Sequence, residues 1–180
     1  FGKKIKIVLT DGNKPIGKGI GPVLEMKDVI SVLDPSKEGP KDLEEKSIFL
    51  AGEIFEMTGK SKKGRGKNLA KEILKSGKAF EKFKEIIQAQ GGKVTDLKTG
   101  QFQRDLVAKK KGVVEIDNKK ISFLARMSGC PLDKKSGIYL HFNTGDKIKV
   151  GDKIITLYSE SKSRLEDATE YYNNEKPIIV

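Results

Sequence analysis

The part of this sequence best suited to chemistry is a glycine-rich turn at Gly17–Pro22, which follows the apolar run Ile5–Leu9 and precedes a segment with helical apolar spacing. Such turns bind phosphate in many proteins, because backbone amides and a helix N-terminus attract anions. The match to known phosphate loops is incomplete: Pro22 replaces the third glycine of the dinucleotide fingerprint, and Asn68 follows Gly66-Lys67 where Ser or Thr is needed. From these residues alone we favour a structural turn that lets strand and helix approach closely.

Three other features have both a chemical and a structural interpretation. The basic segment Lys60–Lys67 could bind an anion or an acidic partner, but a solvated loop between helices is the interpretation we favour. Cys130 is the single cysteine and His141 the single histidine, so an internal disulfide, a zinc site and thiol catalysis are all excluded. Cys130 is predicted to pack as a small apolar group, and His141 to be a hydrogen-bonded core histidine.

The segment Gly145–Ile154 has the glycine and apolar spacing of biotinyl and lipoyl carrier domains. This similarity predicts a barrel-sandwich shape. The position of the modified lysine falls on Ser161, which argues against a swinging cofactor. A non-enzymatic carrier-like or scaffold domain stays open as an alternative function.

Around these candidates, the apolar pattern predicts a strand at Ile5–Leu9 and four helices before residue 92. Asp42 is the expected N-cap of the second helix. The apolar residues of the expected helices run over 24–33, 43–57, 69–74 and 80–87, and we expect the last three helices to pack together. Short β-branched runs then predict a mainly β second half, at 112–116, 138–142 and 153–157. The predicted domains are 1–92, the end of an α/β domain, and 105–180, a β-rich domain, joined by a linker at 93–104.

The amino-acid composition argues against a membrane protein and against a nucleic-acid-binding protein. The 180 residues are 36% hydrophobic, which is enough to form the core of one domain or of two small ones. No apolar run approaches the roughly 20 residues that span a membrane, so we expect a soluble, cytoplasmic protein. The net charge of +11 suggests nucleic-acid binding, but only four of the 36 basic residues are arginine and there is no tryptophan. We therefore expect no nucleic-acid partner. A surface rich in Lys and Glu is typical of hyperthermophile proteins.

The string Leu9–Glu25 resembles the T-D-x-x-x-P-I/L-G…G-x-A-L-E segment of thymidine and pyrimidine-nucleoside phosphorylases. Its Gly-Ile-Gly-Pro ending is similar to the archaeal AMP phosphorylase branch. Further matches follow in the same order along almost the whole chain, at 50–54, 76–79, 83–92, 112–116, 137–138 and 145–151. The resemblance implies an α+β fold: the end of the family's α/β domain, with strand, glycine turn and helices, followed by a mainly β barrel-sandwich C-terminal domain.

The resemblance also implies an activity for a longer parent protein. We expect this parent protein to be a homo-oligomer with no membrane partner. Inorganic phosphate would attack the ribosyl C1′ of AMP, and also of CMP and UMP, to release the base and leave ribose 1,5-bisphosphate. The alternative is a thymidine or pyrimidine-nucleoside phosphorylase that forms (deoxy)ribose 1-phosphate. The family's phosphate loop and its substrate-contacting Arg, Ser and Lys residues lie upstream of Ile5. No catalytic residue and no organic cofactor is therefore assigned to this chain, which we expect to be inactive alone.

One family site does fall within the chain. Bacterial relatives bind a structural potassium ion through two loop carbonyls and an acid, and the matching positions are Ile16, Gly19 and Asp28. Oxygen ligands suit a hard cation. Asp28 replaces the usual Glu, and its alternative role is that of an acid near a helix N-terminus.

The apolar end of the chain, Pro177–Val180, follows a polar segment. It could add a strand to a neighbouring subunit or pack on its own domain, and the sequence leaves both interpretations open.

Overall fold

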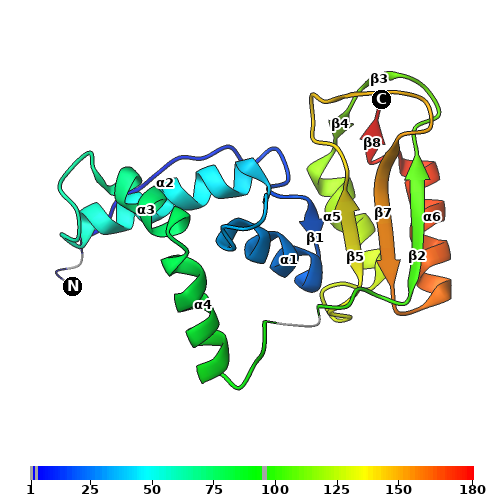
Figure 1. Ribbon diagram of the computed structural model, residues 1–180. Helices are drawn as coiled ribbons and strands as arrows, with labels where there is room; N and C mark the ends of the chain where they lie inside the picture. Colours follow the sequence, from blue (N-terminus) through cyan, green and yellow to red (C-terminus); the bar gives the residue numbers. More distant parts are fainter. Residues whose placement is uncertain (1, 3, 95–96) are drawn as a thin grey trace. The chain divides into compact units, whose positions relative to one another are not determined.

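The computed structural model describes residues 2, 4–94 and 97–180, which form two compact units (Figure 1). The first unit comprises residues 1–11 and 29–96, and the second comprises 12–28 and 97–180. Residues 12–28 join the second unit because they contain β1, Gly19–Ile20, which pairs with β5, Gly137–Leu140. The predicted domain limits, 1–92 and 105–180, place residues 12–28 in the first domain rather than in the second unit. They stay a prediction, and residues 95 and 96 of the predicted linker at 93–104 lie outside the described residues.

The first unit is helical and contains the helices that the apolar spacing predicted. They are α2 (Lys41–Met57), α3 (Gly66–Lys75) and α4 (Lys78–Ala89), together with the last turns of α1 (Pro22–Leu33). Close approach of α2 and α3 depends on two buried glycines, Gly52 and Gly66. A Cβ on Gly66 would lie 2.1 Å from the Gly52 carbonyl oxygen, so a side chain there is incompatible with this crossing.

Two local predictions for this unit were wrong. Ile5–Leu9 is not a strand: no strand within the described residues pairs with it, and Leu9 is 95% exposed. A strand needs a hydrogen-bonded neighbour, so the apolar pattern alone cannot form one. Asp42 is not an N-cap, because α2 begins one residue earlier after Pro40. Its carboxylate accepts a hydrogen bond from the amide of Leu43, in the first turn.

The second unit is built on a four-stranded antiparallel sheet with the order β1-β5-β7-β2, where β7 is Lys153–Ser159 and β2 is Phe102–Val107. The register places Gly19, Tyr139, Thr156 and Asp105 directly opposite one another on successive strands. Two short pairs complete the unit: β3 (Gly112–Val113) with β6 (Lys147–Ile148), and β4 (Glu115–Ile116) with β8 (Ile178–Ile179).

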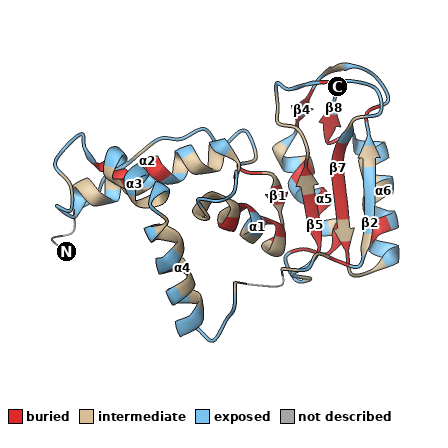
Figure 2. Ribbon diagram, in the orientation of Figure 1, coloured by how far each residue is buried: buried red, intermediate tan, exposed pale blue. Residues whose placement is uncertain are grey.

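The core of the second unit lies between this sheet and two helices, α5 (Asn118–Ser128) and α6 (Lys162–Glu175), as the buried residues in Figure 2 show. Alternate residues of β5 and β7 point to this side, where they join Leu124 of α5 and Leu165 of α6 in one buried cluster. The strand residues are Ile138, Leu140, Ile155 and Leu157, each at most 1% exposed.

The α+β class is confirmed, but α5 and α6 were not predicted in a half expected to be mainly β. The chain end packs on its own unit, because Ile178 and Ile179 pair with β4. None of the described helices is both long and apolar enough to span a membrane.

Candidate functional site

The glycine turn before α1 is held together by close backbone contacts. A Cβ on Gly19 would lie 2.5 Å from the carbonyl group of Leu24, and Gly21 has a φ of +120° beside the Ser136 carbonyl oxygen. Side chains at these positions would clash or be strained. These contacts support the structural interpretation of the turn.

The backbone amides of this turn are bonded to groups of the same chain. The amide of Gly21 donates to Glu25 Oε1 at 2.9 Å, and the amide of Val23 donates to the Lys134 carbonyl at 3.1 Å. The amides of Lys18 and Gly19 donate to Asp28 Oδ2 at 2.6 Å and 2.7 Å. Two carboxylates therefore occupy the positions where a phosphate would accept hydrogen bonds, and the structure does not support the phosphate-loop interpretation.

Of the three predicted metal ligands, the structure brings Gly19 and Asp28 together. Asp28 is 6% exposed, and its contact with Gly19 is to the amide rather than to the carbonyl oxygen. Ile16 lies in the turn before them, and its side chain is exposed. Asp28 is in the second turn of α1, so it orders the glycine turn rather than capping the helix.

The Gly19 carbonyl nevertheless points toward the Asp28 edge of β1. The Lys18 carbonyl accepts from the Leu140 amide, which makes Gly19 and Tyr139 a non-hydrogen-bonded pair of the antiparallel ladder. Both polar backbone groups of Gly19 then point away from β5. No group of three or more His, Cys, Asp or Glu side chains suited to a metal occurs among the described residues. A cation here would need peptide carbonyls beside the carboxylate, which are ligands that hard cations accept.

A polar row on the sheet face opposite α5 and α6 was not predicted from the sequence. His141 Nε2 lies 2.9 Å from Thr156 Oγ1, the Thr156 hydroxyl donates to Asp105 Oδ1 at 2.7 Å, and Lys153 Nζ lies 2.6 Å from Asp105 Oδ2. Thr156 is only 4% exposed. The row links β2, β7 and the end of β5, so it fixes the register of three strands. His141 is hydrogen-bonded, as predicted.

Hydrogen bonding, ion pairing and burial shift the pKa values of the ionisable groups in this row. The hydrogen bond from Lys153, and then that from Thr156, hold the pKa of Asp105 below its usual 3.8. The same contact with Asp105 raises the pKa of Lys153 above its usual 10.5. Burial lowers the pKa of His141. The row is therefore an ion pair next to a neutral histidine at neutral pH, and it has no activated nucleophile.

The basic segment Lys60–Lys67 already has an anionic partner in the same chain, a carboxylate of α2. Glu56 Oε1 accepts a hydrogen bond from the Gly66 amide at 2.9 Å, at the N-terminus of α3. This bond, with one from the Gly64 amide, lowers the pKa of Glu56. The carboxylate occupies the helix N-terminus where an external anion would bind. The structure thus favours the interhelical-loop interpretation.

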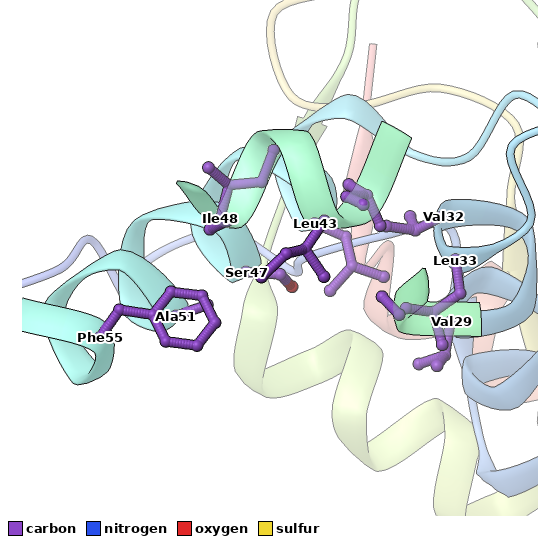
Figure 3. Close-up of a pocket in the computed structure, with 12 residues that line it drawn as sticks. Val29, Val32, Leu33, Leu43, Ser47, Ile48, Ala51 and Phe55 are labelled. Atoms are coloured by element: carbon purple, nitrogen blue, oxygen red, sulfur yellow. The ribbon is translucent and has the colours of Figure 1, made fainter. Parts of the chain in front are cut away.

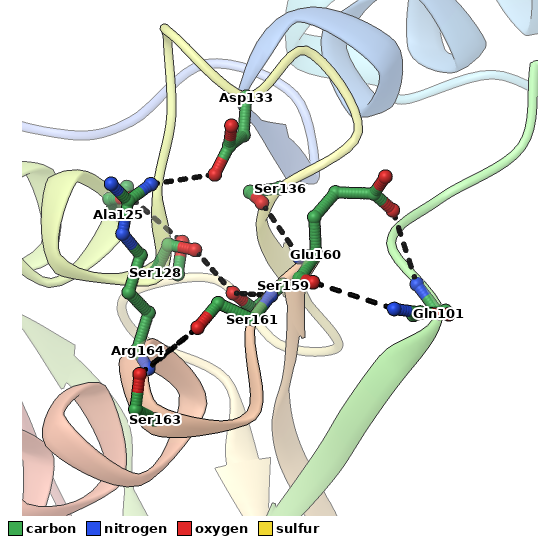
Figure 4. A network of polar contacts seen from close by, with 10 residues as sticks. All are labelled: Gln101, Ala125, Ser128, Asp133, Ser136, Ser159, Glu160, Ser161, Ser163 and Arg164. Atoms are coloured by element: carbon green, nitrogen blue, oxygen red, sulfur yellow. Dashed lines mark hydrogen bonds and ion pairs between the residues drawn. The ribbon is translucent and has the colours of Figure 1, made fainter.

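The beginning of α6 contains a network of serine hydroxyls (Figure 4). Buried Ser159 donates to the Ser128 carbonyl at 2.7 Å and accepts from the Ser161 amide. Ser161 itself caps α6 by accepting from the Arg164 amide. A helix therefore starts where a carrier domain would present its lysine hairpin, which removes the structural basis of the carrier-like alternative.

The thiol of Cys130 is buried rather than reactive. Cys130 belongs to the core, as predicted, and burial raises the pKa of its thiol.

In the first unit, side chains from all four helices line a hollow of about 230 Å³ in which Ser47 is the single polar side chain (Figure 3). No ionisable side chain lines this hollow, so nothing in its lining can act as an acid or base or activate the Ser47 hydroxyl.

Comparison with known proteins adds the family context. Residues 112–178 match the model of the pyrimidine nucleoside phosphorylase C-terminal domain. Along its whole length the chain is 45% identical to the AMP phosphorylases of Methanosarcina mazei and Pyrococcus horikoshii, and 42% identical to a putative thymidine phosphorylase of Legionella pneumophila. It spans 36%, 37% and 35% of the lengths of these relatives.

Proposed function

Because this chain belongs to the thymidine/pyrimidine-nucleoside phosphorylase family, we propose that it is part of a pentosyltransferase that cleaves AMP, and also CMP and UMP, with inorganic phosphate. A phosphate oxygen forms a bond to C1′ while the C1′–N bond breaks. The base nitrogen keeps the electron pair and takes up a proton. The products are the free base and ribose 1,5-bisphosphate. The observation that carries the proposal is the 45% identity to AMP phosphorylases along the entire chain.

In this proposal the 180-residue chain has a structural role and is inactive alone. The polar groups described above have their partners within the chain: the turn amides donate to Asp28 and Glu25, and Asp105 pairs with Lys153. Catalysis of phosphorolysis requires groups that hold phosphate and stabilise an oxocarbenium-like sugar and a departing base. Those groups lie in the remaining part of the longer polypeptide.

A second proposal concerns the cation. We propose that potassium binds at the Asp28 edge of β1, where the Ile16 and Gly19 carbonyls and the Asp28 carboxylate would be its ligands. The orientation of the Gly19 carbonyl supports it. Thermal unfolding of the chain in potassium chloride and in tetramethylammonium chloride tests it. A higher unfolding temperature in potassium, lost in Asp28→Asn, is expected, and equal temperatures in both salts would exclude a stabilising ion.

The reaction is tested by phosphate-dependent base release from AMP, adenosine, uridine and thymidine, with the longer polypeptide and with this chain. Release from AMP by the longer protein alone is the expected result. The 42% identity to a putative thymidine phosphorylase favours one alternative, a pyrimidine-nucleoside phosphorylase. Release only from uridine and thymidine would establish that alternative. Release from none of the four would leave the non-enzymatic scaffold interpretation.

A further inference from the structure

A second hollow of about 250 Å³ lies in the second unit, between the chain after β2 and the C-terminal end of α6. We call it the basic pocket. Its floor is apolar and includes Ile154 and Ile178, 4% and 6% exposed, and the partly buried ring of Tyr172. Its lysines are Lys109, Lys110 and Lys176; none of its lining side chains is acidic, and Val180, the last residue of the sequence, also lies in the lining.

The described lysines of this unit fall into two groups, those paired with a carboxylate and those without such a partner. Lys120, Lys135 and Lys153 each pair with a carboxylate within 4 Å. In the described parts of the chain, no carboxylate pairs with the pocket lysines. Three lysines without a carboxylate partner, around one apolar hollow, favour an anionic occupant.

The backbone that carries these lysines is anchored on both sides of the pocket. The buried residue Ala108, directly before Lys109, donates to the Asp152 carbonyl and accepts from the Gly151 amide, at 2.8 Å and 2.9 Å. On the other side, the Lys176 amide donates to the Tyr172 carbonyl at 3.1 Å. The pocket is therefore formed before any ligand binds, and its lysines need to order only their side chains.

We propose that the basic pocket binds a small organic phosphate monoester, with the phosphate on the three lysines and an apolar or aromatic body on the floor. Ammonium groups act as point charges suited to a compact tetrahedral anion, whereas planar carboxylates are matched better by the fork of arginine. A monoester carries close to two negative charges at neutral pH, with three acceptor oxygens. The Asn173 amide lies in the lining and can hydrogen-bond the body of the ligand.

Titration of the 180-residue chain by NMR tests this proposal independently of the phosphorolysis. AMP carries both the phosphate and an aromatic body, adenosine lacks the phosphate, and ribose 5-phosphate lacks the aromatic group. We expect AMP to shift the amide signals of Lys110 and Tyr172 saturably, with the other two ligands at least about tenfold weaker. Equal binding of adenosine, equal binding of ribose 5-phosphate, or the absence of AMP shifts at these residues would each overturn it.

A pair of double variants separates this site from general charge attraction. Lys110→Gln/Lys176→Gln removes two pocket lysines, and Lys134→Gln/Lys162→Gln removes two exposed lysines outside the pocket lining. The pocket variant is expected to weaken AMP binding by about fivefold to tenfold, and the control by less than about twofold. Equal weakening in the two variants would show a nonspecific effect of net charge. Folding of both is checked by their NMR spectra.

Discussion

Replacement of Asp28 by alanine tests the glycine turn most sharply. Asp28 Oδ2 accepts amide hydrogen bonds at 2.6 Å and 2.7 Å, from Lys18 and Gly19. A hydrogen bond to a charged group contributes about 1.5–3 kcal/mol, and a buried amide without an acceptor is costly. Asp28→Ala is therefore expected to cost the second unit about 3 kcal/mol or more. Asp28→Asn keeps an oxygen acceptor without the charge, and is expected to cost about 1–1.5 kcal/mol.

These energies correspond to measurable temperature shifts. The second unit comprises residues 12–28 and 97–180, and a domain of that size loses about 4–8 °C of unfolding temperature per kcal/mol. We expect a decrease of about 12–24 °C for Asp28→Ala and about 4–12 °C for Asp28→Asn. The control is Asp167→Ala, which removes an exposed carboxylate of α6 in the same unit.

Hydrogen exchange supplies the local readout. The Lys18 and Gly19 amides should be protected in the wild type and should exchange much faster in Asp28→Ala. If these two amides stay protected in Asp28→Ala, or if its unfolding temperature matches that of Asp167→Ala, the carboxylate does not stabilise the turn.

Three further outcomes follow from the packing and the charges. Gly66→Ala should disrupt the crossing of α2 and α3, because its Cβ would lie 2.1 Å from the Gly52 carbonyl oxygen, and we expect early loss of helical circular dichroism on heating. The depressed pKa of Asp105 stabilises the fold above the unfolded value of about 3.9, and this contribution is lost as pH falls through the folded pKa. Asp105→Asn should therefore flatten the acid limb of stability measured by urea unfolding between about pH 5 and pH 2. Ser159→Ala removes a buried hydroxyl with two hydrogen bonds and should cost about 1–3 kcal/mol by the same measurement.

The helices of the first unit were predictable because their apolar residues repeat at helical spacing. In α6, by contrast, Leu165 and Ala168 are the only buried residues of fourteen, so the periodic signal is weak. The sequence signal that could have predicted α5 and α6 is the residue before each helix. Asp117 and Ser161 are N-caps there, and their side chains accept backbone hydrogen bonds at the helix start.

The polar row could not be found in the sequence, because its partners meet only through strand register. Asp105 and Thr156 are 51 positions apart, and no local pattern links them. Ile5–Leu9 shows the opposite case, in which a local strand pattern is present without a pairing strand in the described residues. Local periodicity predicts elements, whereas pairing depends on contacts distant in sequence.

The most direct test of the central proposal is the identity of the sugar product. We would incubate the longer polypeptide with AMP and inorganic phosphate and follow the reaction by phosphorus NMR. We expect loss of the inorganic phosphate signal and the appearance of a pentose with two phosphate-monoester signals, together with free adenine. Unchanged inorganic phosphate, or a sugar product with a single phosphate, would contradict nucleotide phosphorolysis.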